Sequence, residues 1–426
     1  MIINNITQAI WNTPLLEIGK DIHTVSWVEI FAKLEYLNPF GSVKDRTALW
    51  LLEMYLKEGT DKDIIESSSG NTAKALSAIL GIYWKKIYTV TNRIKIKEIA
   101  DTLRLMGASI EELPPGSECP DPSDPDGPFE VIQTHMKSGK YYWTDQYTNA
   151  ANVKVHKETT AKEIYDDLGE IHYFFSGLGT TGSSRGIIEF YQERWMNLRA
   201  VGIITAKGSY IPGIRNIDEM QEVWLYDKSL YENIIQVTEQ EAIQEMQMLI
   251  QKFGILIGPT TGATYAGMKK YFAEQPPVKG SKAVFIACDR VEPYISYLKE
   301  KAPEIFGESK KVPPLPVNNL SVREINISEL EWQSVSSILI DMRSYRSYKL
   351  GHIPGSLNFT FDSLQSFIQK WYLPFTKDIQ ICFICPYWEE SVLMSQIAVS
   401  LGWKAVSLKW WLEEYRAQKY RLTNNM

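Results

Sequence analysis

The 426-residue sequence contains few cysteines and histidines and no long run of apolar residues. Its four cysteines, Cys119, Cys288, Cys382 and Cys385, are too few for a disulfide scaffold and are typical of the reducing cytoplasm. Its five histidines show no metal-ligand spacing, so no metal site is predicted. No stretch reaches the ~18 continuous apolar residues of a membrane span, and the first residues lack the basic and apolar segments of a secretory signal.

Positive charge is not in excess either. The sequence has 45 Lys and Arg against 51 Asp and Glu, a formal net charge of −6, and no long basic run. This argues against nucleic acid or an anionic membrane surface as the main partner. The hydrophobic share of 44% is ordinary for a globular protein. At about 100–200 residues per domain, the length predicts two or three domains.

Over about the first 300 residues, short apolar runs alternate with amphipathic stretches. This alternation predicts an α/β fold with mostly parallel sheets covered on both faces. In such folds ligands bind at the carboxyl ends of strands, in loops that lead into helices. The expected strands are 27–34, 86–90, 172–175, 200–205 and 282–287, and the expected helices include 47–57, 94–106 and 160–167.

Two proline-rich stretches interrupt the alternation. Residues 113–129 are rich in Pro, Asp and Gly and are interpreted as a surface loop. Residues 307–319 (GESKKVPPLPVNN) favour an extended chain and are interpreted as a linker. We therefore expect a first domain at 1–306 and a small α/β domain at 320–426. Its predicted elements are strands 337–341, 380–384 and 404–408 and a helix at 390–401.

Four short segments carry residues suited to an anionic cofactor. NPFGSVKDR (38–46) holds Lys44 in a turn before a helix, where a partly desolvated lysine can form an imine. ESSSGNTA (66–73), SGLGTTGSS (176–184) and GPTTGA (258–263) each join a strand-like run to a helix, a position that favours a carboxylate or phosphate. Singly, each has an ordinary alternative: a solvated lysine, a helix cap or a glycine-rich turn.

Together, in this order, the four segments resemble the fold-type II pyridoxal phosphate (PLP) enzymes of the cysteine synthase and cystathionine β-synthase family. WNTPL (11–15) and DQYTNAAN (145–152), followed by His156, resemble further segments of that family. The resemblance covers roughly residues 1–300. It implies two α/β subdomains with mostly parallel sheets, PLP as the cofactor, an amino-acid substrate and a homodimer.

The resemblance also implies a role for each matching position. Lys44 would form the internal aldimine and shuttle the α-proton, Asn71 would bind the PLP 3′-oxygen, and Thr260 or its neighbour Thr261 would face the pyridine nitrogen. A hydroxyl at that nitrogen does not force its protonation, so prompt loss of a β-leaving group to give an aminoacrylate is favoured. The PLP phosphate and the substrate carboxylate would be bound by Gly179, Thr180, Thr181, Gly182 and Ser183, and by Ser68, Ser69, Thr72 and Gln146, respectively.

Some positions depart from the family pattern and leave the substrate open. Ala73 replaces a usual glycine, and residues 205–207 (TAK) replace a usual Glu-Pro. IRNIDEM (214–220) with LYD (225–227) resembles the phosphoserine-using cysteine synthase M branch. Its Arg215 would pair with the substrate phosphate in a bidentate way, whereas the alternative is a surface arginine paired with Asp218 or Glu219. O-phosphoserine and O-acetylserine are thus both candidates.

Residues 339–358 (LIDMRSYRSYKLGHIPGSLN) resemble the signature of the rhodanese family. The resemblance places a persulfide-forming cysteine at Cys385, where backbone N–H groups and a helix dipole would favour the thiolate. The following residues, PYWEE (386–390), include two glutamates that oppose an anionic sulfur and an anionic donor. Trp410 and Trp411 replace the usual Gly-Gly. A protein-bound or small persulfide is therefore favoured over thiosulfate, and the alternative is a docking module with a retired cysteine.

The sequence predicts PLP-dependent β-replacement on an activated serine by a sulfur nucleophile, giving cysteine or a related thiol or thioether amino acid. The second domain would relay sulfur from a donor or a sulfur-carrier protein. Two alternatives stay open: an amine nucleophile or simple β-elimination, with the second domain as a docking module for a sulfur-carrier protein. Cys382 is expected in the core, because positions i and i+3 of a strand face opposite ways.

Overall fold

The computed structural model of the chain describes residues 2–19, 25–91, 94–113, 127–307, 321–326, 329, 337–368, 372–385 and 389–409. The chain divides into two compact units, of which the first comprises Met1–Glu112 and Ile132–Ser309 and the second contains Lys310–Met426. Cys119, nearly all of the predicted linker, and Trp410 and Trp411 lie outside the described residues.

The first unit contains a six-stranded sheet in the order β1-β2-β10-β7-β8-β9. All neighbours in it are parallel except β1, which pairs antiparallel with β2. The parallel order follows from the sequence, because parallel neighbours need long crossovers, usually helical. The strands are β1 (Leu15–Ile18), β2 (Glu29–Lys33), β7 (Tyr173–Gly177), β8 (Arg199–Thr205), β9 (Asn233–Val237) and β10 (Lys282–Ile286).

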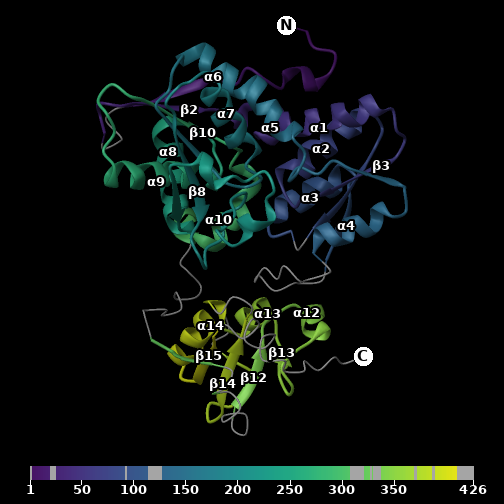
Figure 1. Ribbon diagram of the computed structural model, residues 1–426, viewed down its shortest axis with the longest axis vertical. Coiled ribbons are helices and arrows are strands. Elements are labelled where there is room, and N and C mark those ends of the chain that lie inside the picture. The colour runs from purple at the N-terminus through teal and green to yellow at the C-terminus, as the bar shows by residue number, and fades with distance from the viewer. Residues whose placement is uncertain are drawn as a thin grey trace. The chain divides into compact units, whose positions relative to one another are not determined.

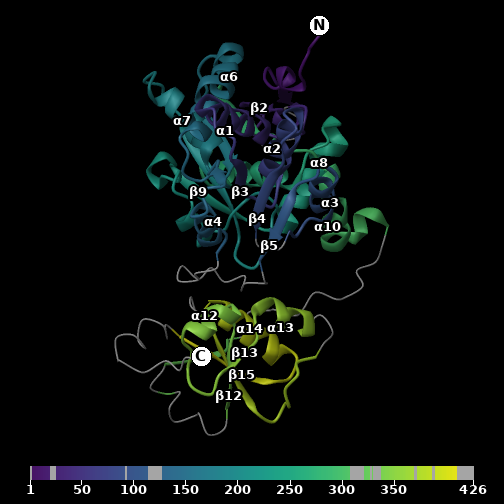
Figure 2. The ribbon, with the colours of Figure 1, turned by 90° about the vertical axis from the view of Figure 1, so that its right-hand side faces the viewer.

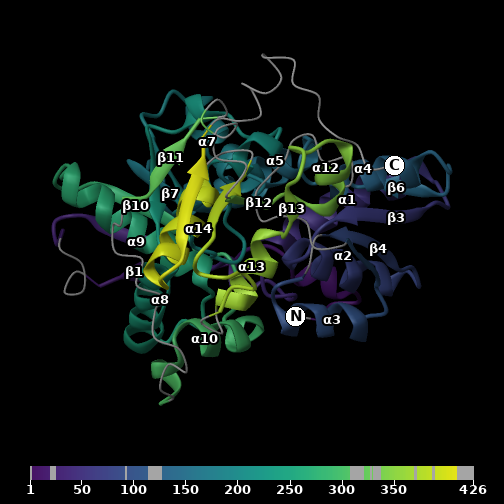
Figure 3. The same ribbon diagram turned by 90° about the horizontal axis from the view of Figure 1, so that it is seen from below.

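A second sheet of the same unit has four parallel strands in the order β5-β4-β3-β6. The two sheets belong to separate lobes, which Figures 1 and 3 show side by side. One lobe contains β10 and β8 of the six-stranded sheet, and the other contains β3 of the four-stranded sheet. The strands are β3 (Asp63–Ser67), β4 (Ile87–Thr91), β5 (Ser109–Glu112) and β6 (Tyr141–Trp143).

Helices connect most of these strands. The α-helices of the first unit are α1 (Lys44–Glu58), α2 (Asn71–Ile82), α3 (Lys97–Leu105), α4 (Pro128–Met136), α5 (Ala151–Val155), α6 (Ala161–Leu168), α7 (Gly182–Gln192), α8 (Glu239–Phe253), α9 (Pro259–Glu274) and α10 (Ile295–Lys301). A π-helical turn, His156–Thr160, joins α5 to α6. Short 3-10 turns lie at Ile6–Ala9, Glu35–Leu37, Glu219–Glu222, Lys228–Leu230, Glu292–Tyr294 and Pro303–Phe306.

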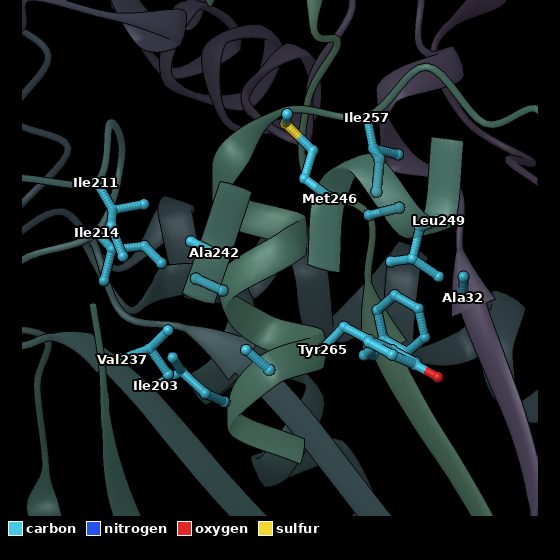
Figure 4. Packing of buried hydrophobic residues seen from close by; sticks show 14 of the residues in the cluster. Ala32, Ile203, Ile211, Ile214, Val237, Ala242, Met246, Leu249, Ile257 and Tyr265 are labelled. Carbon is cyan, nitrogen blue, oxygen red and sulfur yellow. The ribbon is translucent and has the colours of Figure 1, made fainter. Parts of the chain in front are cut away.

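The largest core of the first unit includes residues of α8, α9 and the six-stranded sheet. Ala242 and Met246 of α8 and Tyr265 of α9 are buried members of this cluster (Figure 4). Gly262 permits the close crossing of the two helices, because a Cβ there would lie 2.0 Å from the carbonyl oxygen of Ala242. This contact fixes the N-terminal turn of α9, which bears Thr260.

The second unit contains a five-stranded parallel sheet in the order β11-β15-β14-β12-β13. Figure 2 shows β12, β13 and β15 of this sheet with α12, α13 and α14. Residues of α13 and α14 share one buried cluster with one face of this sheet. Its elements are β11 (Arg323–Ile325), β12 (Ser337–Asp341), α12 (Tyr345–Leu350), β13 (Leu357–Asn358), α13 (Phe361–Ile368), β14 (Gln380–Ile384), α14 (Glu389–Ser400) and β15 (Lys404–Leu408).

The predicted α/β class with mostly parallel sheets is confirmed. Strands β12, β14 and β15 have the predicted bounds. Lys44, expected in the turn before a helix, is instead the first residue of α1. The helix expected at 160–167 is preceded by the π-helical turn, which the apolar spacing did not indicate.

Candidate active site

The turn that immediately precedes Lys44 contacts the residues that follow β10. The backbone N–H of Val43 donates to the carbonyl oxygen of Cys288 at 2.8 Å, and Ser42 pairs with Asp289 in an isolated antiparallel bridge. Strand β10 lies in the middle of its sheet. Lys44 is thereby fixed at the carboxyl end of a central strand, where ligands bind in sheets of this kind.

The amine of Lys44 is withdrawn from bulk water beside the predicted phosphate loop. Its Nζ donates to Oγ1 of Thr180 at 3.3 Å. Burial lowers the pKa of Lys44, and the nearby Cys288 and Asp289 act in the opposite direction. A lowered pKa increases the fraction of neutral amine, the form that attacks a carbonyl carbon. The site thus favours imine formation at Lys44.

The predicted phosphate loop joins β7 to α7 through closely packed glycines. A Cβ on Gly182 would lie 2.3 Å from the side chain of Asn152, and a Cβ on Gly179 would lie 2.7 Å from the carbonyl oxygen of Gly213. The first N–H groups of a helix have no partner within that helix. The N-terminus of α7 therefore offers backbone donors to an anion.

The three hydroxyl residues of this loop differ in their surroundings. Thr181 has a φ of 62°, which is strained for a β-branched residue, and strain of this kind gathers at ligand sites. Its Oγ1 is buried and has no hydrogen-bond partner among the described residues. Oγ1 of Thr180 accepts from Nδ2 of Asn152 at 3.1 Å, and Ser183 is half-buried in the first turn of α7.

A buried polar chain that the sequence did not predict leads away from Thr180. Nδ2 of Asn152 contacts Thr180, and Oδ1 of Asn152 accepts from the hydroxyl of Thr47 at 3.0 Å. Oγ1 of Thr47 lies 3.1 Å from Nε2 of His156. Burial holds the pKa of His156 well below its ordinary value, so the imidazole is neutral. The chain connects α1, α5 and the loop that precedes α7.

Of the residues predicted to bind the substrate carboxylate, Thr72 and Gln146 are hydrogen-bonded to each other, and Ser68 is hydrogen-bonded to the backbone at the start of α2. Thr72 donates to Oε1 of Gln146 at 2.6 Å, and Nε2 of Gln146 donates to the carbonyl oxygen of Ser67 at 2.9 Å. Oγ of Ser68 accepts from two backbone N–H groups of the same turn. Ser69 is exposed. The structure thus brings Ser68, Thr72 and Gln146 together at the N-terminus of α2.

Glu66, whose role was not predicted either, is hydrogen-bonded to the segments that carry Gln146 and Ser67. Its Oε2 accepts from the hydroxyl of Thr144 at 2.6 Å and the backbone N–H of Gln146 at 3.2 Å, and its Oε1 accepts from the N–H of Ser67 at 2.8 Å. Burial raises the pKa of Glu66 to about 8. The carboxyl group connects the ends of β3 and β6, so it sets the position of Gln146.

Asn71 is the first residue of α2, and its amide is engaged on one side only. Its Nδ2 donates to Oδ2 of Asp289 at 2.7 Å and lies 3.3 Å from the hydroxyl of Tyr294. Its Oδ1 is buried without a hydrogen-bond partner among the described residues. Asp289 and Tyr294 could not be predicted as partners of Asn71, because both lie more than 200 residues from it.

The two threonines at the start of α9 have different partners. The hydroxyl of Thr260 donates to the carbonyl oxygen of Pro212 at 2.6 Å and adjoins Gly213, which in turn approaches the phosphate loop at Gly179. Oγ1 of Thr261 accepts from the backbone N–H of Cys288 at 3.1 Å. Thr260 is therefore close to the phosphate loop, whereas Thr261 fastens α9 to β10.

Arg215 lies beside Tyr147. Its guanidinium is 5.1 Å from the ring centroid of Tyr147, the residue after Gln146, and its Nη1 donates to the carbonyl oxygen of Glu219 at 3.1 Å. Asp218, one of the two expected alternative partners, forms an ion pair with Lys207 at 3.4 Å. The structure therefore places a cation against the ring of Tyr147.

A buried ion network under α1 was also not predicted. Arg46, two residues after Lys44, donates to both carboxylate oxygens of Glu35 at 2.7 and 2.8 Å. It also donates to Glu163, which forms a second ion pair with Lys33 at 2.7 Å. These contacts tie α1 to β2 and α6, and so support the helix that begins with Lys44.

In the second unit, Cys385 directly follows β14 and is buried. Its thiol donates to Oε2 of Glu390 at 3.1 Å, and residues 386–388 between them lie outside the described part of the chain. Asp341 and Arg343 form a buried ion pair at 2.8 Å. Cys382 and Cys385 belong to different buried clusters, as expected for opposite faces of a strand.

The described residues contain neither a candidate metal site nor a candidate membrane-spanning helix. No group of three or more His, Cys, Asp or Glu side chains among them could hold a metal ion. None of the described helices is long and apolar enough to pass through a membrane.

Comparison with known proteins identifies both parts of the chain. Residues 6–289 match the family described as pyridoxal-phosphate dependent enzyme, and residues 326–417 match the rhodanese-like domain. Cysteine synthase B of Salmonella typhimurium is 31% identical over 312 residues, which cover 72% of this chain and 97% of that protein.

Two further proteins resemble the same part of the chain. N-(2-amino-2-carboxyethyl)-L-glutamate synthase of Cupriavidus metallidurans is 30% identical over 296 residues, covering 65% of this chain and 83% of that protein. The crystal structure of a hydrogen sulfide-producing enzyme of Fusobacterium nucleatum matches with a TM-score of 0.62 and 33% identity, covering 69% of this chain and all of that one.

Proposed function

This chain belongs to the pyridoxal-phosphate dependent enzyme family and carries a rhodanese-like domain, and from this premise we propose that it replaces the β-substituent of an activated serine with a sulfur nucleophile. The product would be cysteine or a related thiol or thioether amino acid. The observation that carries the proposal is the set of segments that meet at Lys44. The loop at Thr180 contacts its amine, and Asp289 after β10 contacts both Ser42, in the turn before Lys44, and Asn71.

The residues present fit PLP. Lys44 would hold the cofactor covalently, Gly179–Ser183 would bind its phosphate, and Asn71 and Thr260 would contact the ring. The buried Oγ1 of Thr181 has no hydrogen-bond partner among the described residues, as expected of a hydroxyl that would donate to the phosphate. When bound, PLP supplies an electron sink adjacent to the α-carbon of the substrate.

The side chains of this chain supply binding and proton transfer. The pKa of Lys44 is lowered, so its Nζ can take and hold the α-proton of the substrate. Oγ1 of Thr180 accepts a hydrogen bond from this Nζ and so orients the amine. Thr72 and Gln146 would turn from each other to the substrate carboxylate. Thr260 offers a hydroxyl and not a carboxylate to the ring nitrogen, which supports β-elimination and replacement over reactions that need a long-lived carbanion.

For the leaving group we propose phosphate, with acetate as the alternative. Arg215 supports phosphate because its planar donor fork suits a phosphate group and because it lies over Tyr147, next to Gln146. The test is kcat/KM for O-phosphoserine and O-acetylserine with the wild type and Arg215→Ala. The expected result is a loss of about tenfold or more for phosphoserine alone. Equal losses for both substrates would exclude phosphate recognition by Arg215.

For the second domain we propose a sulfur relay through a persulfide on Cys385. Two equivalents of a thiol would cleave the S–S bond of this persulfide, restoring the Cys385 thiol and releasing sulfide while the thiols become a disulfide, and the sulfide would then replace the β-substituent. The fusion supports it, since one domain moves sulfur and the other has a carbon that accepts it. Cys385→Ala should slow product formation from persulfide donors and leave free sulfide as effective as before. Equal rates for the variant with every donor would exclude the relay.

A second candidate is β-replacement by an amine, or β-elimination, with the second domain as a docking module for a sulfur-carrier protein. The carboxylate of Glu390 against the Cys385 thiol favours it, because a second negative charge at that distance is opposed. The similarity to N-(2-amino-2-carboxyethyl)-L-glutamate synthase supports an amine as the nucleophile at the β-carbon. The similarity to a hydrogen sulfide-producing enzyme supports β-elimination. Product analysis with a panel of nucleophiles distinguishes the two candidates.

A further inference from the structure

Asp289 is a buried carboxyl group at the meeting point of four segments of the site. It is 3% exposed and directly follows Cys288 after β10. Its backbone pairs with Ser42 in the lysine turn, and its Oδ2 accepts from Asn71 at 2.7 Å and from the hydroxyl of Tyr294. Nothing in the function derived so far uses this residue.

The N-cap of α9 is also shaped around Asp289. A Cβ on Gly258 would lie 2.4 Å from Oδ1 of Asp289, so only glycine fits there without displacement. Oδ1 itself is buried and has no hydrogen-bond partner among the described residues. Asp289 therefore touches the segments that carry Lys44, Asn71 and Thr260.

The contact between Asp289 and Asn71 sets the orientation of the Asn71 amide, with Nδ2 and not Oδ1 toward Asp289. An ionised carboxylate only accepts hydrogen bonds, so Nδ2 must point toward it. The reversed amide would place Oδ1 of Asn71 2.7 Å from another acceptor oxygen with no proton between them. The 3.3 Å contact of Nδ2 with Tyr294 is longer, so a stronger acceptor can replace it.

Groups from several elements surround the carboxyl of Asp289. Burial raises its pKa, and the hydroxyl of Tyr294, Lys74 of α2, the amide of Asn71 and Lys44 of α1 act in the opposite direction. Cys288 also adjoins the group, and Lys74 is itself influenced by Asp45, Arg290 and Glu292. The hydroxyl of Tyr294 and Nδ2 of Asn71 both donate to Oδ2, so this oxygen acts as an acceptor toward Asn71.

We propose that Asp289 is a positioning residue for PLP: its carboxylate holds one N–H of the Asn71 amide and so keeps the other N–H available to the 3′-oxygen of the cofactor. The inference rests on the proposed role of Asn71. Without Asp289 the amide can turn, and its carbonyl oxygen would then repel an ionised 3′-oxygen. The cofactor would bind less tightly and would lose its proton at a higher pH.

The test uses the full-length protein and its variants Asp289→Ala, Asp289→Asn and Asn71→Ala, with Asp166→Asn on the exposed face of α6 as the matched control. Two quantities are measured: the Kd of PLP for the cofactor-free protein, by fluorescence titration, and the pH midpoint of the visible absorbance change of the bound cofactor. The Kd for Asp289→Ala should be about tenfold above that of the wild type, and its midpoint should be about one pH unit above that of Asp289→Asn, which removes the same charge beside Lys44; both are the effect of losing one hydrogen bond to a charged group.

Asp289→Asn keeps an acceptor oxygen but no charge, so its Kd should lie between those of the wild type and Asp289→Ala, and its midpoint shows the effect of losing the charge alone. It also keeps the test decisive if the alanine variant does not fold. A wild-type Kd for Asp289→Asn, or a change in thermal stability with equal midpoints for Asp289→Ala and Asp289→Asn, would overturn the inference provided that Asn71→Ala alters the midpoint. If Asn71→Ala itself leaves both quantities unchanged, the proposed role of Asn71 is wrong, and the inference that rests on it is overturned too.

Discussion

Stability of the first unit should depend on pH through Glu66. Burial raises the pKa of this carboxyl from an ordinary 4.5 to about 8 in the folded protein. A raised pKa means that the folded state binds the proton more tightly than the unfolded chain does. The stabilising contribution is therefore fully present below about pH 4.5 and is lost as the pH rises through about 8. At 1.36 kcal/mol per unit, the whole loss is roughly 5 kcal/mol.

Glu66→Gln removes this titration and keeps the shape of the side chain. Near pH 5 the variant should be less stable than the wild type by about 1–2 kcal/mol, because its NH₂ group replaces one acceptor of the bonds from Thr144, Ser67 and Gln146. Near pH 8 the difference should reverse or vanish, since the wild type then bears the cost of a buried charge. Buried Asp45, whose pKa is raised to about 7, titrates in both proteins and cancels in the difference.

The assay is urea unfolding of the cofactor-free protein at pH 5, 6.5 and 8, followed by circular dichroism. The control is Glu53→Gln on α1, whose side chain is 45% exposed, and it should show no pH-dependent difference. A difference between Glu66→Gln and the wild type that stays constant from pH 5 to pH 8 would refute the reasoning. The carboxyl would then titrate normally in the folded state.

Three further predictions follow from other contacts. Borohydride reduction of the PLP-loaded protein should add the mass of the cofactor to the peptide containing Lys44, and Lys44→Ala should lose this label; labelling of another lysine would contradict the assignment. Gly182→Ala should destabilise the protein by about 1–3 kcal/mol and weaken PLP binding, because its Cβ would lie 2.3 Å from Asn152; an unchanged Kd and Tm would count against the close packing. Arg46→Met should cost about 3–5 kcal/mol in thermal or urea unfolding, because Glu35 would be left buried without its ion-pair partner; a loss below 1 kcal/mol would contradict this role of the ion pair.

Much of the fold was predictable because it depends on local pattern. Buried strands such as β14 and β15 are short, mostly apolar runs that begin at a polar residue, so they could be located from the sequence. The alternation of strand and helix also predicted parallel sheets. The π-helical turn at His156–Thr160 was missed, because an extra residue in a helix leaves little trace in apolar spacing.

The site divides in the same way. Lys44, Asn71, the loop at Gly179–Ser183 and Thr260 lie in short motifs whose chemistry depends on residue type and neighbouring positions, and the sequence by itself determined them as candidates. Their supports, Asp289, Glu66 and Glu163, are single acidic residues among many, and only the tertiary structure decided which of them face the site. The physical reason is that burial, charge pairing and the orientation of an amide depend on groups from distant parts of the chain. Asn71 and Asp289 are 218 positions apart, and no local pattern joins them.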